Sequence, residues 1–289
     1  MEAYFISLFI LVTIYWVLSL SLQISLGFAG LLNFAHIAFI AIGAYASSLL
    51  SKLGVPFGIS LLLGATLAML SGYLVALPCR RLKGDYLALT TLGFSLIVFV
   101  VALNWTNLTG GPAGLADIPS PQLFGISLAS NAHFLVFSLF ISLCTYLIIK
   151  RLSVTPFGIA LQAARDSELG TQILGINTFK LMVVSLAVSA FFAGLGGGLL
   201  AHYITFIDPS LFTLSQFIPI LAIVILGGLT SLEGTLLAAV VVVLLPEPLR
   251  FINLSSSIIG PVRELSYSLL LLVLLMVQPK GFYGKIRLK

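Results

Sequence analysis

The sequence predicts an all-α fold, a polytopic bundle of about eight to ten membrane-spanning helices of which some are broken or re-entrant. Hydrophobic residues make up 60% of the 289 residues and charged residues only 8%, so lipid must be the solvent for most of the chain. The apolar residues form continuous runs instead of alternating segments, which favours helices over a membrane β-barrel. We expect one membrane domain over residues 1–289, with one short helix outside the membrane.

Apolar runs close to the roughly 20 residues that a membrane span needs recur along the whole chain. We place the spans near residues 4–22, 35–50, 57–78, 86–104, 132–149, 181–202, 213–227, 234–250 and 264–279. The first run has no basic segment before it and similar runs follow, so it is expected to be a retained helix and not a cleaved signal.

Basic residues fall mainly between alternate spans. One side of the predicted membrane holds eleven of them, namely Arg80, Arg81, Lys83, Lys150, Arg151, Arg165, Lys180, Lys280, Lys285, Arg287 and Lys289. The other side holds three, Lys52, Arg250 and Arg263. Because cytoplasmic loops are enriched in Lys and Arg, we expect a multi-pass inner membrane protein with a cytoplasmic C-terminus and an outside N-terminus. A re-entrant segment near residues 23–34 would reverse the N-terminal side. These residues flank apolar runs and form no stripe, so no nucleic-acid partner is expected.

Residues 23–36, QISLGFAGLLNFAH, interrupt the first apolar region with Gly27, Gly30, Asn33 and His36. Unpaired polar groups are costly in hydrocarbon, so this stretch is expected to be a broken or re-entrant element buried in protein. An alternative is that Asn33 and His36 only hydrogen-bond between helices.

Three later stretches are also rich in glycine. The 105–131 connection contains TGGPAGL, which excludes a regular helix and predicts a structured turn region on the outside. The glycines of 190–200 predict close helix packing. In 221–250, Gly227, Gly228 and Gly234 break an apolar run around Ser231 and Glu233, which suggests a counterpart of the first interruption.

Residues 150–180 are the most polar internal window and must lie in water. Thr155 is expected to cap a helix, Pro156 to occupy its first turn and Gly175 to follow its last turn. This predicts one helix over about 156–174. Its periodicity places Ile159, Ala163, Gly170, Ile173 and Leu174 on one face and Arg165, Glu168 and Gln172 on the other, with Leu161 and Asp166 breaking the pattern. One face can lie on the membrane domain, and the other is available to a partner. The residues alone also fit a solvated loop that happens to be helical.

No motif for catalysis occurs. The sequence lacks a phosphate-binding G-x-x-x-x-G-K-[ST] loop, an H-E-x-x-H zinc motif and a G-x-S-x-G elbow. Cys79 and Cys144 lack the spacing of a metal or disulfide framework. We therefore expect no enzyme, no catalytic residues, no metal and no cofactor.

Seven collinear blocks carry a family resemblance. They are GLLNFAH (30–36), RLKGDYLALTTLGF (81–94), TGGPAGL (109–115), PFGIALQAARDSELGTQILGIN (156–177), SAFFAGLGGGL (189–199), LGGLTSLEGT (226–235) and QPKGFYG (278–284). From about residue 20 to 285 the chain resembles the M-type permease subunits of branched-chain amino acid ABC importers. The resemblance implies a transmembrane permease domain with a second homologous permease subunit, two cytoplasmic ATPase subunits, an extracytoplasmic substrate-binding protein and an amino acid as cargo.

In that family a cytoplasmic coupling helix docks on an ATPase, and here it corresponds to residues 156–175. The expected coupling residues are Gly158, Leu161, Arg165, Asp166, Glu168 and Gly175. The sequence departs from the family at Ile159 and Gln162, where basic residues are usual, at Gly170 and Thr171, where alanines are usual, and at Ala35, where glycine is usual. Because of these departures, the expected contact with the ATPase should depend more on Arg165, on Glu168 and on the shape of the helix.

A zwitterionic cargo needs a few polar groups between apolar walls. The expected pathway residues are Asn33, His36, Thr90, Thr91, Gly227 and Gly228. Related permeases for urea, short amides or other amino acids remain alternatives within the class. An ion-coupled transporter should carry more charged residues within its spans, and a membrane enzyme should carry a polar catalytic cluster.

Overall fold

The computed structural model describes residues 2–81, 84–123, 126–247, 260–262, 265–269, 272–273 and 281–283. Its longer helices are α1 (Glu2–Leu22), α2 (His36–Lys52), α3 (Phe57–Ala76), α4 (Asp85–Asn104), α6 (Asn131–Ser153), α9 (Thr178–Ile204), α10 (Leu214–Gly227) and α11 (Leu232–Leu244). The shorter elements are η1 (Gln23–Phe28), η2 (Pro78–Arg81), α5 (Thr106–Thr109), η3 (Gly111–Ala113), β1 (Gln122–Leu123), β2 (Ile126–Ser127), α7 (Pro156–Asp166), α8 (Glu168–Ile173) and η4 (Pro209–Phe212).

Five described helical stretches are long and apolar enough to cross a membrane. They are Ala3–Phe28, Phe57–Ala76, Asp85–Asn104, Asn131–Ser153 and Thr178–Ile204. The 17-residue α2 and the apolar helices α10 and α11, of 14 and 13 residues, are shorter than a simple span. The prediction of a polytopic all-α bundle is confirmed. The predicted 264–279 span and the basic residues Lys280, Lys285, Arg287 and Lys289 fall largely or wholly outside the described residues.

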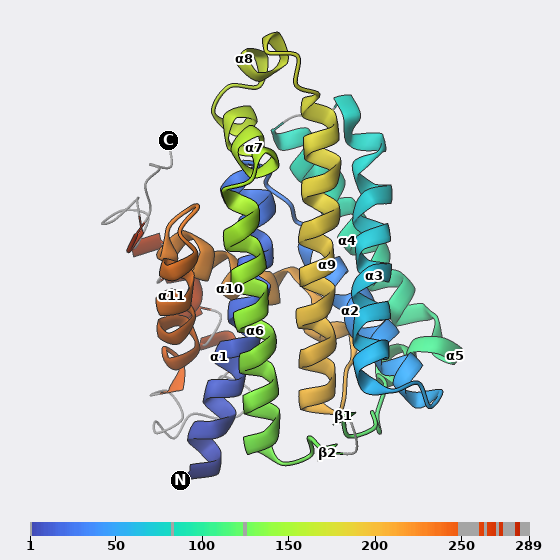
Figure 1. Cartoon of the computed structure of the whole chain (residues 1–289). Helices are drawn as coiled ribbons and strands as arrows, with labels where there is room; N and C mark the ends of the chain where they lie inside the picture. The colour runs from blue at the N-terminus through green and yellow to red at the C-terminus, as the bar shows by residue number, and fades with distance from the viewer. Residues whose placement is uncertain are drawn as a thin grey trace.

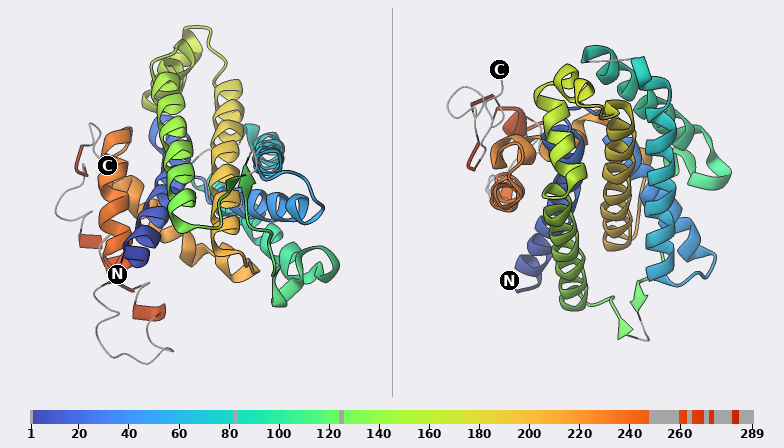
Figure 2. Two further views of the ribbon diagram at one scale, coloured as in Figure 1. Left: turned by 60° about the horizontal axis from the view of Figure 1, so that its bottom comes forward. Right: turned by 45° about the horizontal axis from the view of Figure 1, so that its top comes forward.

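Helix α9 runs through the centre of the bundle (Figure 1). In its most apolar stretch 78% of the residues are buried, against 28% in both α4 and α6, so α9 is a core helix while α4 and α6 keep wide apolar faces for lipid or another subunit. The turned views keep α11 beside α1 and α6, on the opposite side of the bundle from α3 and α4 (Figure 2). Helices α7 and α8 cap one end, which we call the α7 end, and the β1–β2 hairpin lies at the other (Figure 1).

The glycines of α9 make its central position possible. A methyl group on Gly194 would lie 2.5 Å from the Cβ of Ala68, and one on Gly197 would lie 2.1 Å from the carbonyl oxygen of Ile40. Because α9 itself has no side chain at these positions, its backbone packs closely against α2 and α3. The predicted close helix packing is confirmed.

The described part of the connection before α6 forms the structured turn region that the sequence predicts. Leu115 of this connection exchanges two backbone hydrogen bonds, of 2.7 and 3.1 Å, with Ile207 of the turn after α9. The two-residue strands β1 and β2 pair as a small antiparallel hairpin, a local addition to the helical fold. Cys79 and Cys144 are free thiols.

Two interruptions divide the apolar regions where the sequence predicts them. The first break, residues 23–35, consists of the π-helical turn η1 and an irregular stretch. The second break, residues 228–231, is the tight turn between α10 and α11. In the first break Gln23, Asn33 and the adjacent His36 are buried, so polar groups lie inside an otherwise apolar bundle.

Candidate functional site

The start of α7 forms as its sequence predicts. The amide of Gly158 donates to the Thr155 hydroxyl oxygen over 3.3 Å, and Pro156 follows in the first turn. A methyl group on Gly158 would lie 2.2 Å from the carbonyl oxygen of Leu152. Glycine at 158 therefore lets α7 fold back tightly on the end of α6.

The predicted single helix over 156–174 is wrong, because Ser167 divides it. Ser167 has an extended backbone (φ −154°, ψ 100°), and its side chain accepts a 3.2 Å hydrogen bond from the amide of Gly170. The serine thus ends α7 and caps α8, because its side-chain hydrogen bond to the backbone competes with the bonding of a continuous helix. Gly175 ends the second helix with φ +79°, in agreement with the prediction.

The predicted faces of this region are also wrong. Ile159, Ile173 and Leu174 are 59%, 84% and 76% exposed, whereas Leu161 is 3% exposed. The predicted faces require one continuous helix with a straight axis. The backbone bends at Ser167, so α7 and α8 do not share that axis. Within α7 the buried face follows Gly158 and Leu161, and Arg165 continues it one turn later.

Arg165 connects α7 to the first break. Its Nη1 donates a 2.7 Å hydrogen bond to the carbonyl oxygen of Gly27, while Asp166 accepts 2.9 Å bonds from its Nε and Nη2. The Arg165 side chain is only 15% exposed and the Asp166 side chain 69%. Arg165 therefore points into the bundle, and Asp166 keeps its charge at the surface.

Glu168 connects α8 to the start of α9. Its Oε1 accepts hydrogen bonds from Gln172, at 3.1 Å, and from the hydroxyl of Thr178, at 3.4 Å. Asn177 caps α9 by accepting a 3.0 Å bond from the amide of Lys180. These contacts fix the return of the chain from α8 into the bundle.

A cavity of about 890 Å³ lies between these elements at the α7 end. Its walls include Gly30, Leu31, Leu87, Arg165, Glu168 and Phe179. The cavity thus adjoins the first break on one side and α7 and α8 on the other.

Gln23 joins the two breaks, although it is not among the residues predicted for the site. Its Nε2 donates to the carbonyl oxygen of Gly228 over 2.9 Å, and its Oε1 accepts from the amide of Thr230 over 3.0 Å. The residue is fully buried. An amide side chain with no water around it must satisfy its donor and acceptor within the protein, and this was the available sequence signal.

Three of the predicted pathway residues surround the irregular part of the first break. Asn33 Oδ1 accepts a 3.0 Å bond from the amide of Ala35, and Thr91 Oγ1 accepts a 3.1 Å bond from the amide of Phe34. His36 Nε2 lies 3.2 Å from the carbonyl oxygen of Leu18. Among the described residues, Asn33 Nδ2 and His36 Nδ1 are buried without a hydrogen-bond partner.

The other predicted pathway residues lie elsewhere. Thr90 is half-exposed and its hydroxyl donates to the Tyr86 carbonyl oxygen at 2.8 Å, so it does not share a surface with buried Thr91. A methyl group on Gly227 would lie 2.6 Å from the carbonyl carbon of Gly234, and Gly228 has φ +96°. Gly228 therefore begins the second break, and Gly227 lies directly before it at the end of α10.

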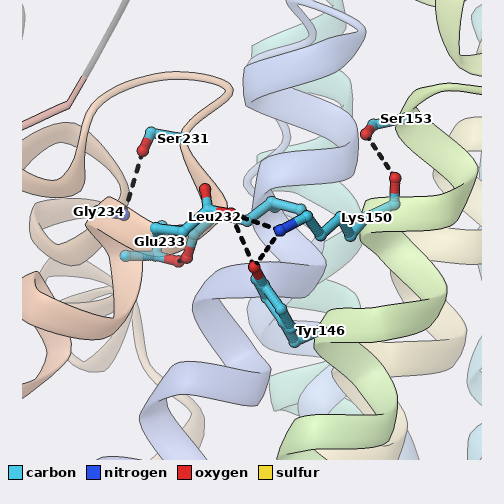
Figure 3. Close-up of polar contacts among 8 residues, drawn as sticks. Tyr146, Lys150, Ser153, Ser231, Leu232, Glu233 and Gly234 are labelled. Atoms are coloured by element: carbon cyan, nitrogen blue, oxygen red, sulfur yellow. Dashed lines mark hydrogen bonds and ion pairs between the residues drawn. The ribbon is translucent and has the colours of Figure 1, made fainter.

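An ion pair anchors the second break on its outer side (Figure 3). Glu233 Oε1 accepts hydrogen bonds from Lys150 Nζ, at 2.9 Å, and from Tyr146 Oη, at 2.7 Å. Ser231 caps α11 by accepting a 3.1 Å bond from the amide of Gly234. The two anchoring residues belong to α6, whose end leads directly into α7.

Comparison with known proteins identifies the class. Residues 4–278 match the family described as the permease component of branched-chain amino acid transport systems. The Escherichia coli K12 high-affinity branched-chain amino acid transport system permease protein LivM is 35% identical over 301 residues, which cover 94% of this chain and 68% of the relative. A probable LivM of Methanocaldococcus jannaschii is 29% identical, with coverages of 93% and 90%.

The Escherichia coli K12 high-affinity branched-chain amino acid transport system permease protein LivH is a more distant relative, 27% identical over 282 residues that cover 90% of this chain and 87% of LivH. No solved structure matches the chain. The resemblance predicted from the seven sequence blocks is confirmed. With its multi-pass helical fold and a match over nearly its whole length, the chain belongs to the family of permease components of branched-chain amino acid transport systems.

Proposed function

We propose that the chain is the membrane subunit of an ABC importer for branched-chain amino acids, and that residues 156–175 couple it to an ATPase. The observation that carries the coupling proposal is the hydrogen bond from Arg165 to the Gly27 carbonyl oxygen. Through this contact, a displacement of α7 acts on the first break inside the bundle. The chain has no phosphate-binding loop of its own, so the energy must come from separate ATPase subunits.

The complete assembly holds a second homologous permease subunit, two cytoplasmic ATPase subunits and an extracytoplasmic binding protein. The similarity of this chain to both LivM and LivH supports pairing of two related permeases. The wide apolar faces of α4 and α6 provide surfaces for lipid and for that partner.

The exposed face of α7 and α8 is the proposed ATPase contact. It presents Ile159, Leu169, Ile173 and Leu174, of which the last three are at least 72% exposed. Such a cluster on a connection between spans is unfavourable in water unless a partner covers it. Arg165 and Leu161 hold the other face of α7 on the bundle, and the exposed Asp166 and the less exposed Glu168 flank the apolar cluster.

The α7 end is proposed to face the cytoplasm, and the C-terminus with it. Lys150, Arg151 and Lys180 lie on the elements of this end, and the amides of Phe282 and Tyr283 bond the carbonyl oxygens of Leu226 and Gly227 beside the second break. Cysteines placed at exposed Ala163 and Leu53 should react with an impermeant maleimide from opposite sides of the membrane. Labelling of the Ala163→Cys variant from outside intact cells would contradict this orientation.

The cargo pathway is proposed to pass the first break near Asn33, His36 and Thr91. Two buried nitrogens there, Asn33 Nδ2 and His36 Nδ1, lack partners among the described residues and can contact a polar cargo group. The surrounding walls are apolar, which suits an aliphatic side chain.

Transport by the complete assembly in lipid vesicles tests the proposed function. When the ATPase subunits face the lumen, ATP inside the vesicles should drive accumulation of labelled leucine that is supplied outside with the binding protein. Accumulation of urea in place of leucine would identify the substrate alternative. Uptake driven by an ion gradient without ATP would instead identify a secondary transporter.

Ile173→Asp should separate docking from folding. Ile173 is 84% exposed, so the charge is tolerated in the free chain but is unfavourable against an apolar ATPase surface. We expect loss of the ATPase subunits from the purified assembly and loss of ATP-driven uptake. Leu53→Asp is the matched control, because Leu53 is 80% exposed but follows α2 at the opposite end. Normal ATPase retention by Ile173→Asp would remove α8 from the interface.

A further inference from the structure

Gln23 occupies the point where three parts of the molecule meet. It begins η1 directly after α1, and its fully buried amide group reaches the second break, 205 to 208 residues away in sequence. Its Nε2 donates to the Gly228 carbonyl oxygen and lies 3.5 Å from the Ser231 carbonyl oxygen, while its Oε1 accepts from the Thr230 amide. One side chain thus uses both its donor and its acceptor on the backbone of the same turn.

The neighbouring glycine preserves this contact. A methyl group on Gly27 would lie 1.9 Å from Gln23 Oε1 and 3.1 Å from the Thr230 amide nitrogen. Glycine at 27 therefore leaves room for the Gln23 amide, and its carbonyl oxygen accepts the hydrogen bond from Arg165. One turn of η1 thus lies between a contact to α7 and a contact to the second break.

These contacts form a continuous polar connection from α7 to the α10–α11 turn. It runs from the Arg165 guanidinium through Gly27 and η1 to Gln23, and then to residues 228–231. The same turn is followed by Glu233, which is anchored to Lys150 of α6, the helix that leads into α7. The turn is therefore held at two points, and both connect back to α7.

We propose that Gln23 is a positioning residue that transmits the movement of α7 to the α10–α11 turn during the transport cycle. This inference rests on the proposed function, since it assumes that an ATPase moves α7. Apolar contacts between these elements can slide, whereas buried hydrogen bonds have no water to exchange with and hold one register. A displacement at Arg165 consequently moves η1 and the second break together.

The complete assembly in vesicles, with Gln23→Leu, tests the inference. Leucine of similar volume fills the site but makes neither hydrogen bond. We expect normal assembly and ATPase activity, with the leucine accumulated per ATP reduced by about tenfold. Gln23→Glu keeps an acceptor for the Thr230 amide but, when ionised, loses the donor to Gly228, and should also be uncoupled.

A double substitution distinguishes a shared connection from two separate sites. Arg165→Met should also lower leucine accumulated per ATP, and combining it with Gln23→Leu should add little, because either change interrupts the same path. Gln216→Leu is the control, since this α10 glutamine is bonded by its side chain to neither break. A normal coupling ratio in Gln23→Leu, or loss of ATPase activity together with uptake, would overturn the inference.

A distance measurement covers the case in which the Gln23 variants do not assemble, and it does not depend on the cargo. Spin labels at Ala163 in α7 and Leu229 in the second break, with Cys79 and Cys144 replaced by serine, report their separation in each nucleotide state. If the two elements move together, this separation stays constant while the assembly cycles. A nucleotide-dependent change in the separation would refute the connection. Failure of the unmodified assembly to take up leucine would refute the proposed cargo and leave this distance test in place.

Discussion

The two helix breaks are built in different ways. On the two helices that flank the second break, glycines meet backbone: a methyl group on Gly227 would lie 2.6 Å from the Gly234 carbonyl carbon, and one on Gly234 would lie 2.0 Å from the Gly227 carbonyl oxygen. In the first break, the atoms nearest to such a methyl group belong to side chains, namely Gln23 Oε1 at Gly27 and Arg165 Cγ at Gly30. Backbone atoms cannot move aside as a side chain can, so the second break is the more rigid of the two.

The two breaks also differ in where their hydrogen-bond partners come from. The second break satisfies part of its backbone locally, through the Ser231 cap and the bonds that Gly228 makes to the end of α10, and its other polar contacts come from the single side chain of Gln23. The first break depends on distant partners, with Arg165 and Thr91 each supplying a side-chain contact. This difference predicts that the second break moves as a unit with η1, while the irregular part of the first break, residues 29–35, rearranges.

Gly227→Ala should give the largest effect on folding and tests the rigidity of the second break. The added methyl group pushes α10 and α11 apart, and overpacking of this kind costs about 1–3 kcal/mol. We expect a clear fall in the thermal midpoint of the detergent-solubilised protein. Gly93→Ala in α4 is the matched control, because nothing lies within 4 Å of the added methyl there. Equal stability of the two variants would show that the Gly227–Gly234 contact is not tight.

Asn33→Leu should have a smaller effect and tests the polar character of the first break. The substitution removes the side-chain acceptor of the Ala35 amide and the buried Nδ2, which lacks a partner among the described residues. Single polar contacts within membranes are worth about 0.6 kcal/mol, so we expect roughly a threefold fall in leucine uptake with ATPase docking intact. Unchanged leucine uptake in reconstituted vesicles would assign Asn33 to packing alone.

The sequence predicts features whose causes are local. The Thr155 cap, Pro156 and Gly175 each act within one helical turn, and all three form as expected. The division at Ser167 is also local, and a serine followed by Glu168 was its unused signal.

The features that sequence reasoning missed depend on distant partners. The direction of Arg165 is set by a carbonyl oxygen 138 residues away, and the role of Gln23 by a turn 205 residues away. No periodicity encodes such a pair. The only clue was energetic, since a polar side chain placed within an apolar run must find a partner when the chain folds.

Glu233→Gln should give the smallest effect. It compares the exposed Glu233–Lys150 ion pair with the glycine contact between α10 and α11. The Glu233 and Lys150 side chains are 60% and 54% exposed, and exposed ion pairs contribute little because water and salt screen them. Glutamine keeps an oxygen that can accept from Tyr146, so the α6–α11 contact should persist. We expect a slight fall in the thermal midpoint at low salt that disappears at high salt. A loss as large as that of Gly227→Ala would show that the outer anchor, and not the glycine contact, holds the second break in place.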